Sequence, residues 1–320
     1  MINKYVDGDI GLPVFRGPYL QQDAHLAAFL FSADLDRLRA LCFKNLIAPG
    51  DRQIIYLPLL SNVMVVFADM FVSSLDERDQ KVGRIPETEV GFWVLTVAMR
   101  KVGPAYVPHH LAWFLPYLFV DESNAIATGR EVYGFNKLMG RFHKPQHIQT
   151  PQFSVDVLGF KKFSPEAEGI IERLLEIRRT DDAGDGLSET WESWENAKTA
   201  VDQELLKGIG TAPKRILVEL GTRLINASIP IVFLKQFRDV SDTQQACYQA
   251  IVEAPIKIKR FDQGGFLSGR YTMSLNHLES HPLAQTLGLR LINRELRSTA
   301  GIWMKVDFML GEGAEVWKAM

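Results

Sequence analysis

The sequence predicts an α+β protein, because strand-like segments fill the first 160 residues and return after residue 230, with helical patterns between them. Of the 320 residues, 47% are hydrophobic and 23% are charged, which is typical of a globular protein with a sizeable core. Strands that resume after a helical stretch indicate an insertion within one body. We therefore expect a single domain over residues 1–320, with a helical insertion at about residues 164–228.

In the first half, the expected strands are rich in β-branched and aromatic residues and lie between polar breaks. They are Ile54–Leu59, Val63–Val72, Gly91–Met99, Ala125–Thr128 and Phe153–Leu158. One helix is expected there, because Ser32-Ala33-Asp34 offers an N-cap. Apolar residues follow this cap at helical spacing: Leu35, Leu38, Leu41 and Cys42. The segment from Leu111 to Leu118 is ambiguous between helix and strand.

From residue 164 the pattern becomes helical. Ser164-Pro165-Glu166 is typical of a helix start, and apolar residues follow it at helical spacing: Ile170, Ile171, Leu174, Leu175 and Ile177. Thr180–Gly186 is expected to be a loop. A second helix is expected from Ser188, with Trp191, Trp194, Val201 and Leu205 on one side, and a third from Pro213 to Asn226. The later strands are expected at Ile231–Phe237, Ala246–Lys259, Phe266–Leu275 and Ile302–Leu310.

Composition excludes several classes of function. The net charge is −2, so no basic excess is available for a nucleic acid partner. Cys42 and Cys247 are too few for a disulfide framework or a zinc site, and they suit a cytoplasmic location. The apolar stretch Leu111–Val120 is too short to span a membrane, and the charged start of the chain lacks the apolar region of a signal peptide. His109-His110 is a poor metal site, so no metal is expected.

Lys137 is the residue with the clearest chemical potential. It is the one cation in an apolar context, between Phe135 and the pair Leu138 and Met139. A lysine is ordinarily a solvated surface group. If Lys137 is buried, desolvation lowers its pKa and leaves a neutral amine, the form that attacks a carbonyl carbon to give a Schiff base.

Three motifs resemble the acetoacetate decarboxylase family, a known case of an activated lysine. Gly129-Arg130-Glu131, a short aromatic segment and Lys137 match the family's spacing before its Schiff-base lysine. Phe15-Arg16-Gly17-Pro18-Tyr19 resembles its amino-terminal motif, and Thr88-Glu89 resembles the pair that supplies an active-site carboxylate. The resemblance extends over most of the chain.

The resemblance implies a cone-like, closed antiparallel β-barrel with the lysine inside and helices outside, acting as a homo-oligomer without an organic cofactor or metal. Lys137 would be the nucleophile and Glu89 the acid–base residue, with Glu87 as the rival for that role. The remaining roles implied are a pocket lining of Phe15, Tyr19, Phe135 and Met139, an ion pair of Arg130 with Glu131 that fixes the lysine loop, and interface anchors at Trp191 and Trp194.

Three positions depart from the family pattern. Leu138 replaces a second lysine, Ala24 replaces an arginine that would hold a substrate carboxylate, and Asp69 is only the nearest candidate for a second acid. We therefore expect a Schiff-base-forming lyase that acts on a small oxo-acid or other carbonyl substrate, by decarboxylation or by aldolase- or dehydratase-type chemistry. The alternative is a non-catalytic protein that keeps the barrel for small-molecule binding or assembly.

Overall fold

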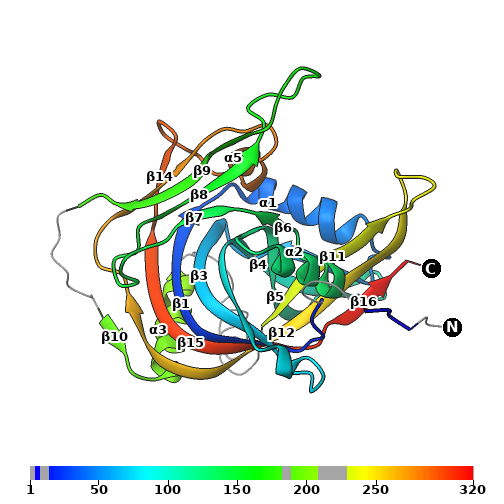
Figure 1. Ribbon diagram of the computed structural model, residues 1–320, viewed down its shortest axis with the longest axis horizontal. Helices are drawn as coiled ribbons and strands as arrows, with labels where there is room; N and C mark the ends of the chain where they lie inside the picture. Colours follow the sequence, from blue (N-terminus) through cyan, green and yellow to red (C-terminus); the bar gives the residue numbers. More distant parts are fainter. Residues whose placement is uncertain (1–3, 8–13, 182–188, 208–228, 320) are drawn as a thin grey trace.

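Strands dominate the structure, a computed structural model that describes residues 4–7, 14–181, 189–207 and 229–319. They form two sheets, and short helices lie against them. Figure 1 shows the long strands β1 (Tyr19–Ser32), β3 (Asn62–Ser74) and β15 (Ala300–Leu310) as nested arcs around the interior. The α+β class predicted from the sequence is confirmed.

The larger sheet has 11 strands. Besides the three arcs it contains β2 (Ile54–Pro58), β4 (Arg84–Val102), β5 (Ala105–Val120), β6 (Lys137–Met139), β10 (Glu189–Trp191), β11 (Pro230–Arg238), β12 (Ala246–Phe266) and β16 (Ala314–Lys318). Hydrogen-bonded neighbours follow the order β2-β4-β3-β1-β15-β12-β11-β5-β6, and β10 and β16 also pair with β12. Because β5 pairs with β4 as well as with β11, the pairings form a ring.

β12 takes part in four of these pairings. Its first half pairs with β11 and β16, over residues 246–255 and 250–253. Its second half pairs with β15 over residues 256–266 and with β10 over residues 264–266. The side chain of Glu253, in the first half, accepts a hydrogen bond of 2.6 Å from the Tyr56 hydroxyl of β2.

The smaller sheet covers one side of the larger one. It has the order β14-β13-β9-β8-β7, and its strands are β7 (Arg141–His143), β8 (Phe153–Gly159), β9 (Ile170–Arg179), β13 (Tyr271–Leu275) and β14 (Glu295–Arg297). Aromatic rings join the two sheets. Phe153 lies 4.8 Å from Phe67 and 6.2 Å from Phe29, and Tyr271 lies 5.0 Å from Phe29, between ring centroids. The main core therefore sits between the sheets.

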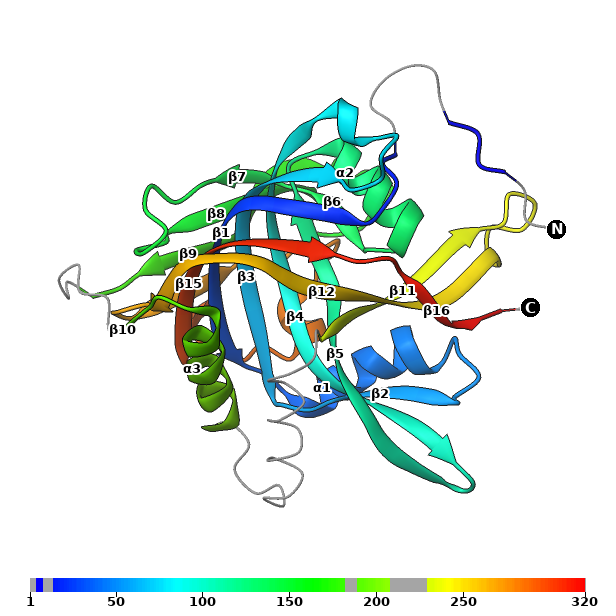
Figure 2. The ribbon, with the colours of Figure 1, turned by 90° about the horizontal axis from the view of Figure 1, so that it is seen from below.

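Helices occupy the margins of the sheets. α1 (Leu35–Cys42) begins as expected at Asp34, whose carboxylate accepts hydrogen bonds from the backbone of Asp36 and Arg37. The others are η1 (Phe43–Ile47), η2 (Gln80–Val82), α2 (Ser123–Thr128), η3 (Gly129–Tyr133), α3 (Trp194–Lys207) and α5 (Leu283–Leu287). Figure 2 shows α3 beside β12 and α1 beside β2.

Most of the expected strands are present. Those confirmed are Ile54–Leu59 in β2, Val63–Val72 in β3, Gly91–Met99 in β4, Phe153–Leu158 in β8, Ile231–Phe237 in β11, Ala246–Lys259 in β12 and Ile302–Leu310 in β15. The ambiguous segment Leu111–Leu118 lies within β5. The expected strand Phe266–Leu275 is broken, because β12 ends at Phe266 and β13 begins only at Tyr271.

Two expected elements are wrong. Ala125–Thr128 belongs to α2, where two alanines favour a helix more than the single Ile126 favours a strand. The expected helix over Ile170–Ile177 is strand β9, which pairs with β8 and β13 on its two edges. Hydrogen bonds to two neighbouring strands outweigh the helical spacing of its apolar residues, and Ser164-Pro165-Glu166 starts only a turn.

The expected helical insertion at residues 164–228 is therefore wrong over β9 and β10. Its second helix begins at Trp194, after β10, whereas Ser188, most of the expected loop Thr180–Gly186 and the expected helix Pro213–Asn226 lie outside the described residues. Trp191 is only 1% exposed and packs against Phe266, so it is a core residue of this chain rather than an interface anchor. Trp194 packs against Phe261. The single domain and the closed, cone-like barrel remain predictions.

A tight backbone turn aims the segment that carries Lys137. Helices α2 and η3 run continuously to Gly134, which has a φ of +91° and ends η3 in the left-handed conformation. A Cβ at this position would lie 2.4 Å from the Cα of Lys235 on β11. Glycine is therefore required both by conformation and by the close approach of the two backbones.

We predict that Gly134→Ala destabilises the fold more than a glycine substitution that meets conformational strain alone. The left-handed conformation costs an L-residue about 1–2 kcal/mol, and overpacking against Lys235 adds about 1–3 kcal/mol. Gly103→Ala is the matched control, since Gly103 has a φ of +59° and open space around its Cα. Urea denaturation measures the unfolding free energy of both variants. Equal losses in the two would mean that the close approach of Gly134 to Lys235 adds nothing to the cost.

Candidate active site

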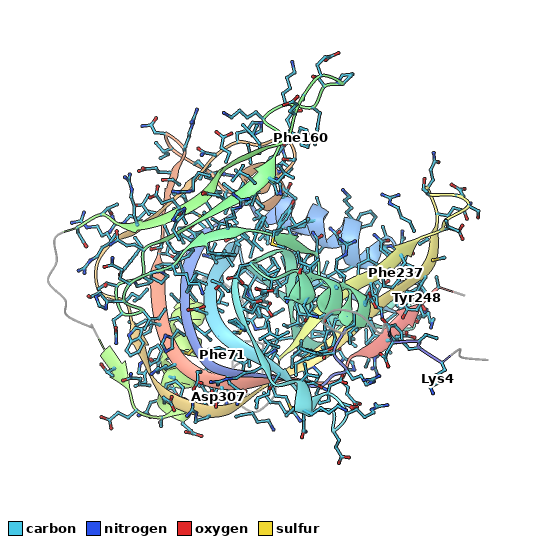
Figure 3. All side chains as sticks on the ribbon, in the orientation of Figure 1. Lys4, Phe71, Phe160, Phe237, Tyr248 and Asp307 are labelled. Carbon is cyan, nitrogen blue, oxygen red and sulfur yellow. The ribbon has the colours of Figure 1, made fainter. Side chains whose placement is uncertain are left out.

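A cavity lies between the larger sheet and the segment formed by α2 and η3. It has a volume of about 80 Å³, roughly five to eight times the minimum of about 10–15 Å³ that holds one water molecule. Its apolar lining is Phe15, Tyr19, Met70, Val72, Ile85, Trp93, Leu115, Ala125, Tyr133, Phe135, Ile231, Ile256, Phe308 and Leu310. Figure 3 shows how densely side chains fill the space inside the arcs. The polar side chains are few, and the two acidic ones, Glu87 and Glu89, interact with Lys137.

Lys137 is the first residue of β6 and is 8% exposed. β6 pairs in parallel with β5, with Lys137 opposite Leu118. The methylene groups of Lys137 pass the Cα of Gly129 so closely that a Cβ there would lie 3.0 Å from Cδ. The Nζ atom lies 5.4 Å from the centre of the Phe135 ring. The structure therefore places Lys137 inside the cavity, as expected from the resemblance.

Glu87 is the immediate partner of Lys137. Its Oε1 atom lies 2.6 Å from Nζ, and its side chain is only 5% exposed. Burial disfavours the ammonium form of a lysine, whereas an adjacent carboxylate favours it. From the sequence, we expected burial alone to keep the Lys137 amine neutral, and we did not anticipate the Glu87 carboxylate beside it. In the structure, Lys137 is a member of a buried ion pair.

Glu89 is the second acidic group in the cavity. It lies two residues beyond Glu87 on β4, so both side chains point to the same side of the strand. Burial is the largest cause that raises the pKa of Glu89, to about 8; the charge of Lys137 opposes this shift, while the charge of Glu87 and a hydrogen bond with it add to it. Glu89 therefore carries a proton at neutral pH, next to the Glu87 that pairs with Lys137.

Three of the four predicted lining residues are in place. Phe15, Tyr19 and Phe135 are buried and line the cavity, and the Tyr19 hydroxyl donates to the backbone oxygen of Phe15. The prediction for Met139 is wrong. Alternation along β6 would put Met139 on the same side as Lys137, but Met139 is the last residue of this short strand, is 47% exposed and is not among the lining residues.

The predicted ion pair of Arg130 with Glu131 is also wrong. Glu131 accepts a hydrogen bond of 2.9 Å from the Tyr5 hydroxyl. Arg130 is exposed and lines a second cavity, outside the Lys137 cavity. The lysine loop is instead held by a Tyr133 hydroxyl bond of 2.7 Å to the Gly311 carbonyl and by a Lys235 bond of 3.1 Å to the Val132 carbonyl.

The three positions that depart from the family pattern lie away from the cavity. Ala24 is fully buried beside Ala68, Met70 and Val306. Asp69 binds Lys144 at 2.7 Å and accepts a hydrogen bond from Thr88, so it does not serve as a second acid in the cavity. Leu138 is partly buried against the main core. Among the described lining residues, Lys137 is the only cation.

Sequence reasoning missed three polar lining residues, Gln21, Asn124 and Thr128. Gln21 lies two residues after Tyr19 on β1, and the two-residue alternation of a strand could have revealed it. Its amide nitrogen, in the orientation that satisfies its neighbours, donates to the carbonyls of Phe308 and Tyr19 at 2.8 and 3.2 Å. Thr128 directly precedes Gly129, and its buried hydroxyl has no hydrogen-bond partner within the part of the chain that the structure describes.

The described residues contain no group of three or more His, Cys, Asp and Glu side chains that could hold a metal ion. Within the same residues, no helix is long and apolar enough to cross a membrane.

Solved structures of known enzymes resemble this chain. Acetoacetate decarboxylase from Legionella pneumophila has a TM-score of 0.58 at 15% identity, covering 94% of this chain and 88% of its own. The enduracididine biosynthesis enzyme MppR in complex with pyruvate has a TM-score of 0.53 at 13% identity, covering 93% and 90%. An acetoacetate decarboxylase-like enzyme from Sphingomonas wittichii has a TM-score of 0.53 at 12% identity, covering 96% of each chain. No protein-family model and no curated protein matches the sequence. The chain has the acetoacetate decarboxylase-like fold, as the sequence motifs suggested.

We predict that Glu89→Gln makes the protein increasingly more stable than the parent as the pH rises. The folded state keeps the proton on Glu89 up to a pKa of about 8, whereas an unfolded glutamate loses it near pH 4.3. The parent therefore loses stability between these values, by at most about 1.4 kcal/mol per pH unit.

Chemical denaturation of parent and variant at several values from pH 5 to pH 9 tests this. The difference in unfolding free energy should grow up to about pH 8 and then level off. Glu77→Gln, at an exposed position, is the control and should give a constant difference. A constant difference for Glu89→Gln too would show that the carboxyl is already ionised in the folded protein.

Proposed function

We propose that this chain, built on the acetoacetate decarboxylase-like fold, is a Schiff-base-forming lyase that acts on a small oxo-acid or other carbonyl compound. The observation that carries the proposal is the position of Lys137, buried in a small apolar cavity with Nζ 2.6 Å from Glu87 and with Glu89 nearby. In this proposal the ring of strands is the closed, cone-like barrel that encloses the lysine, and Lys137 is the nucleophile.

The ion pair supplies the base for the first step. Glu87 takes one proton from the ammonium of Lys137 across their hydrogen bond, and the neutral amine adds to the carbonyl carbon of the substrate. The nitrogen of the adduct passes a second proton to the former carbonyl oxygen, and Glu87 then returns its own proton to the hydroxyl so formed, which leaves as water. The product is a protonated imine, and the Glu87 carboxylate remains beside it as its counterion.

The iminium then accepts an electron pair from the neighbouring carbon. The pair comes from a broken bond to CO2, to a proton or to another carbon, and the enamine that results needs a proton at carbon. Glu89 carries a proton at neutral pH because burial raises its pKa to about 8, so it is suited to deliver that proton. In this scheme Glu87 is the base and Glu89 the acid, which divides the role first given to Glu89 alone.

The remaining groups bind rather than react. Phe15, Tyr19 and Phe135 shape the cavity and keep water from the amine, which strengthens the electrostatic contacts inside it. The cytoplasmic location and the homo-oligomer expected from the sequence belong to the same proposal, as does a single domain.

One observation favours a different class of function. The Lys137 amine already has a partner in the buried Glu87 carboxylate, and a protein that only binds small molecules would keep such a pair unchanged. The alternative is therefore a non-catalytic binding or assembly protein with the same fold.

Borohydride reduction in the presence of pyruvate or acetoacetate separates the two. We expect a covalent adduct on Lys137, detected by peptide mass, that is absent from Lys137→Arg. Lys235→Arg is the matched control, because Lys235 is half-buried nearby and burial lowers its pKa as well; it should keep the adduct. Binding without any adduct would favour the non-catalytic protein, and an adduct that persists in Lys137→Arg would rule out Lys137 as the nucleophile.

A further inference from the structure

The charges in the cavity balance without a substrate. Lys137 contributes one positive charge and Glu87 one negative charge, while Glu89 is neutral at neutral pH because burial raises its pKa to about 8. Burial also raises the pKa of Tyr19 and of Tyr133, so both phenols stay uncharged. Formation of the iminium keeps this balance, because the nitrogen retains its positive charge and Glu87 its negative charge.

A substrate with a carboxylate would disturb this balance. Lys137 is the only cation among the described residues that line the cavity, and it is already paired. Arg16 and Arg84, which flank the lining residues Phe15 and Ile85 in the chain, bind acidic residues outside the cavity: Arg16 binds Asp7 and Asp79, and Arg84 binds Asp23. Lys144 binds Asp69, and Arg130 lines the second cavity instead. An unpaired carboxylate in an apolar site, beside a second carboxylate, is strongly disfavoured.

The rest of the lining suits an uncharged molecule. Branched and aromatic side chains make up most of it, among them Val72, Ile85 and Ile256. The uncharged polar groups are suited to a carbonyl or hydroxyl oxygen. Thr128 has a buried hydroxyl without a partner in the described structure, and the amide oxygen of Gln21 is left as an acceptor once its nitrogen binds two backbone carbonyls.

We propose that the substrate is a neutral carbonyl compound, a ketone or aldehyde with a short hydrocarbon body, rather than an oxo-acid. This inference rests on the proposed Schiff-base function and narrows its substrate class. The volume of about 80 Å³ fits a molecule of only a few heavy atoms.

The reaction changes accordingly. The carbonyl oxygen leaves as water with two protons from the Lys137 ammonium, and the iminium forms. Without a carboxylate on the substrate, loss of CO2 is not available. The electron pair can come from a C–H bond next to the iminium carbon, and the proton of that bond then goes to Glu87. Alternatively, it can come from a bond to a β carbon that carries a hydroxyl. The hydroxyl proton then goes to Glu87, and the β carbon leaves as a neutral aldehyde. These are the steps of enolisation and of aldol cleavage.

A pair of ligands with the same shape tests the inference. In 4-methylpentan-2-one, two methyl groups replace the two carboxylate oxygens of acetoacetate. Equal concentrations of both compete for parent protein under borohydride reduction, and the masses of the Lys137 peptide distinguish the products, including the isopropyl adduct that decarboxylated acetoacetate leaves. We expect at least a tenfold preference for the neutral ketone. A preference for acetoacetate would overturn the neutral-substrate inference and leave the Schiff-base function standing, whereas no adduct from either would overturn both.

Glu87→Gln tests the cause of the preference. In this variant the iminium lacks its counterion, so a substrate carboxylate supplies the missing negative charge. The ratio of ketone to acetoacetate adducts should fall at least tenfold, even if both adducts form more slowly. Glu131→Gln, which removes a carboxylate outside the cavity, is the control and should leave the ratio near that of the parent. An unchanged ratio in Glu87→Gln would mean that the preference does not come from charge, and the inference would fail.

Discussion

The ion pair between Lys137 and Glu87 is the interaction on which the rest of the site depends. Either charge alone would be costly inside an apolar cavity, and removal of one partner leaves the other unpaired. The two groups, 2.6 Å apart, come from strands that share one neighbour. Strand β5 pairs with β4 on one edge and with β6 on the other, where Lys137 lies opposite Leu118, and Glu87 lies just beyond the last β4–β5 pair, Glu89 with Val120.

Backbone geometry then decides how closely the lysine is enclosed. Gly129 lets the Lys137 methylenes lie directly on the chain, and Gly134 lets η3 turn sharply beside β11. Aromatic rings complete the enclosure, with Phe135 packed 4.1 Å from Phe233 between ring centroids. The cavity is thus formed by residues from distant parts of the sequence. The Gly-Arg-Glu stretch and Lys137, by contrast, are close together in the sequence.

Much of the sheet could be predicted, because β-branched and aromatic runs such as Val63–Val72 have few alternatives to a buried strand. Ile170–Ile177 could not, since its helical spacing is outweighed by pairing on both edges, and one of the two partner strands is more than 90 residues away. Lys137 was predictable from its motif. Its pairing with Glu87 was not, because Glu87 and Glu89 share one side of β4 and only the folded structure shows which of them reaches Nζ.

Strand β12 connects more strands of the larger sheet than a strand with one neighbour on each edge would. Its two halves have different neighbours, β11 and β16 before residue 256 and β15 and β10 after it, so no other strand can replace it in either half. A local opening anywhere along β12 would separate strands that are far apart in the chain. An opening of β12 would therefore break backbone hydrogen bonds to four other strands, which makes it more costly than the opening of an edge strand such as β2 or β14.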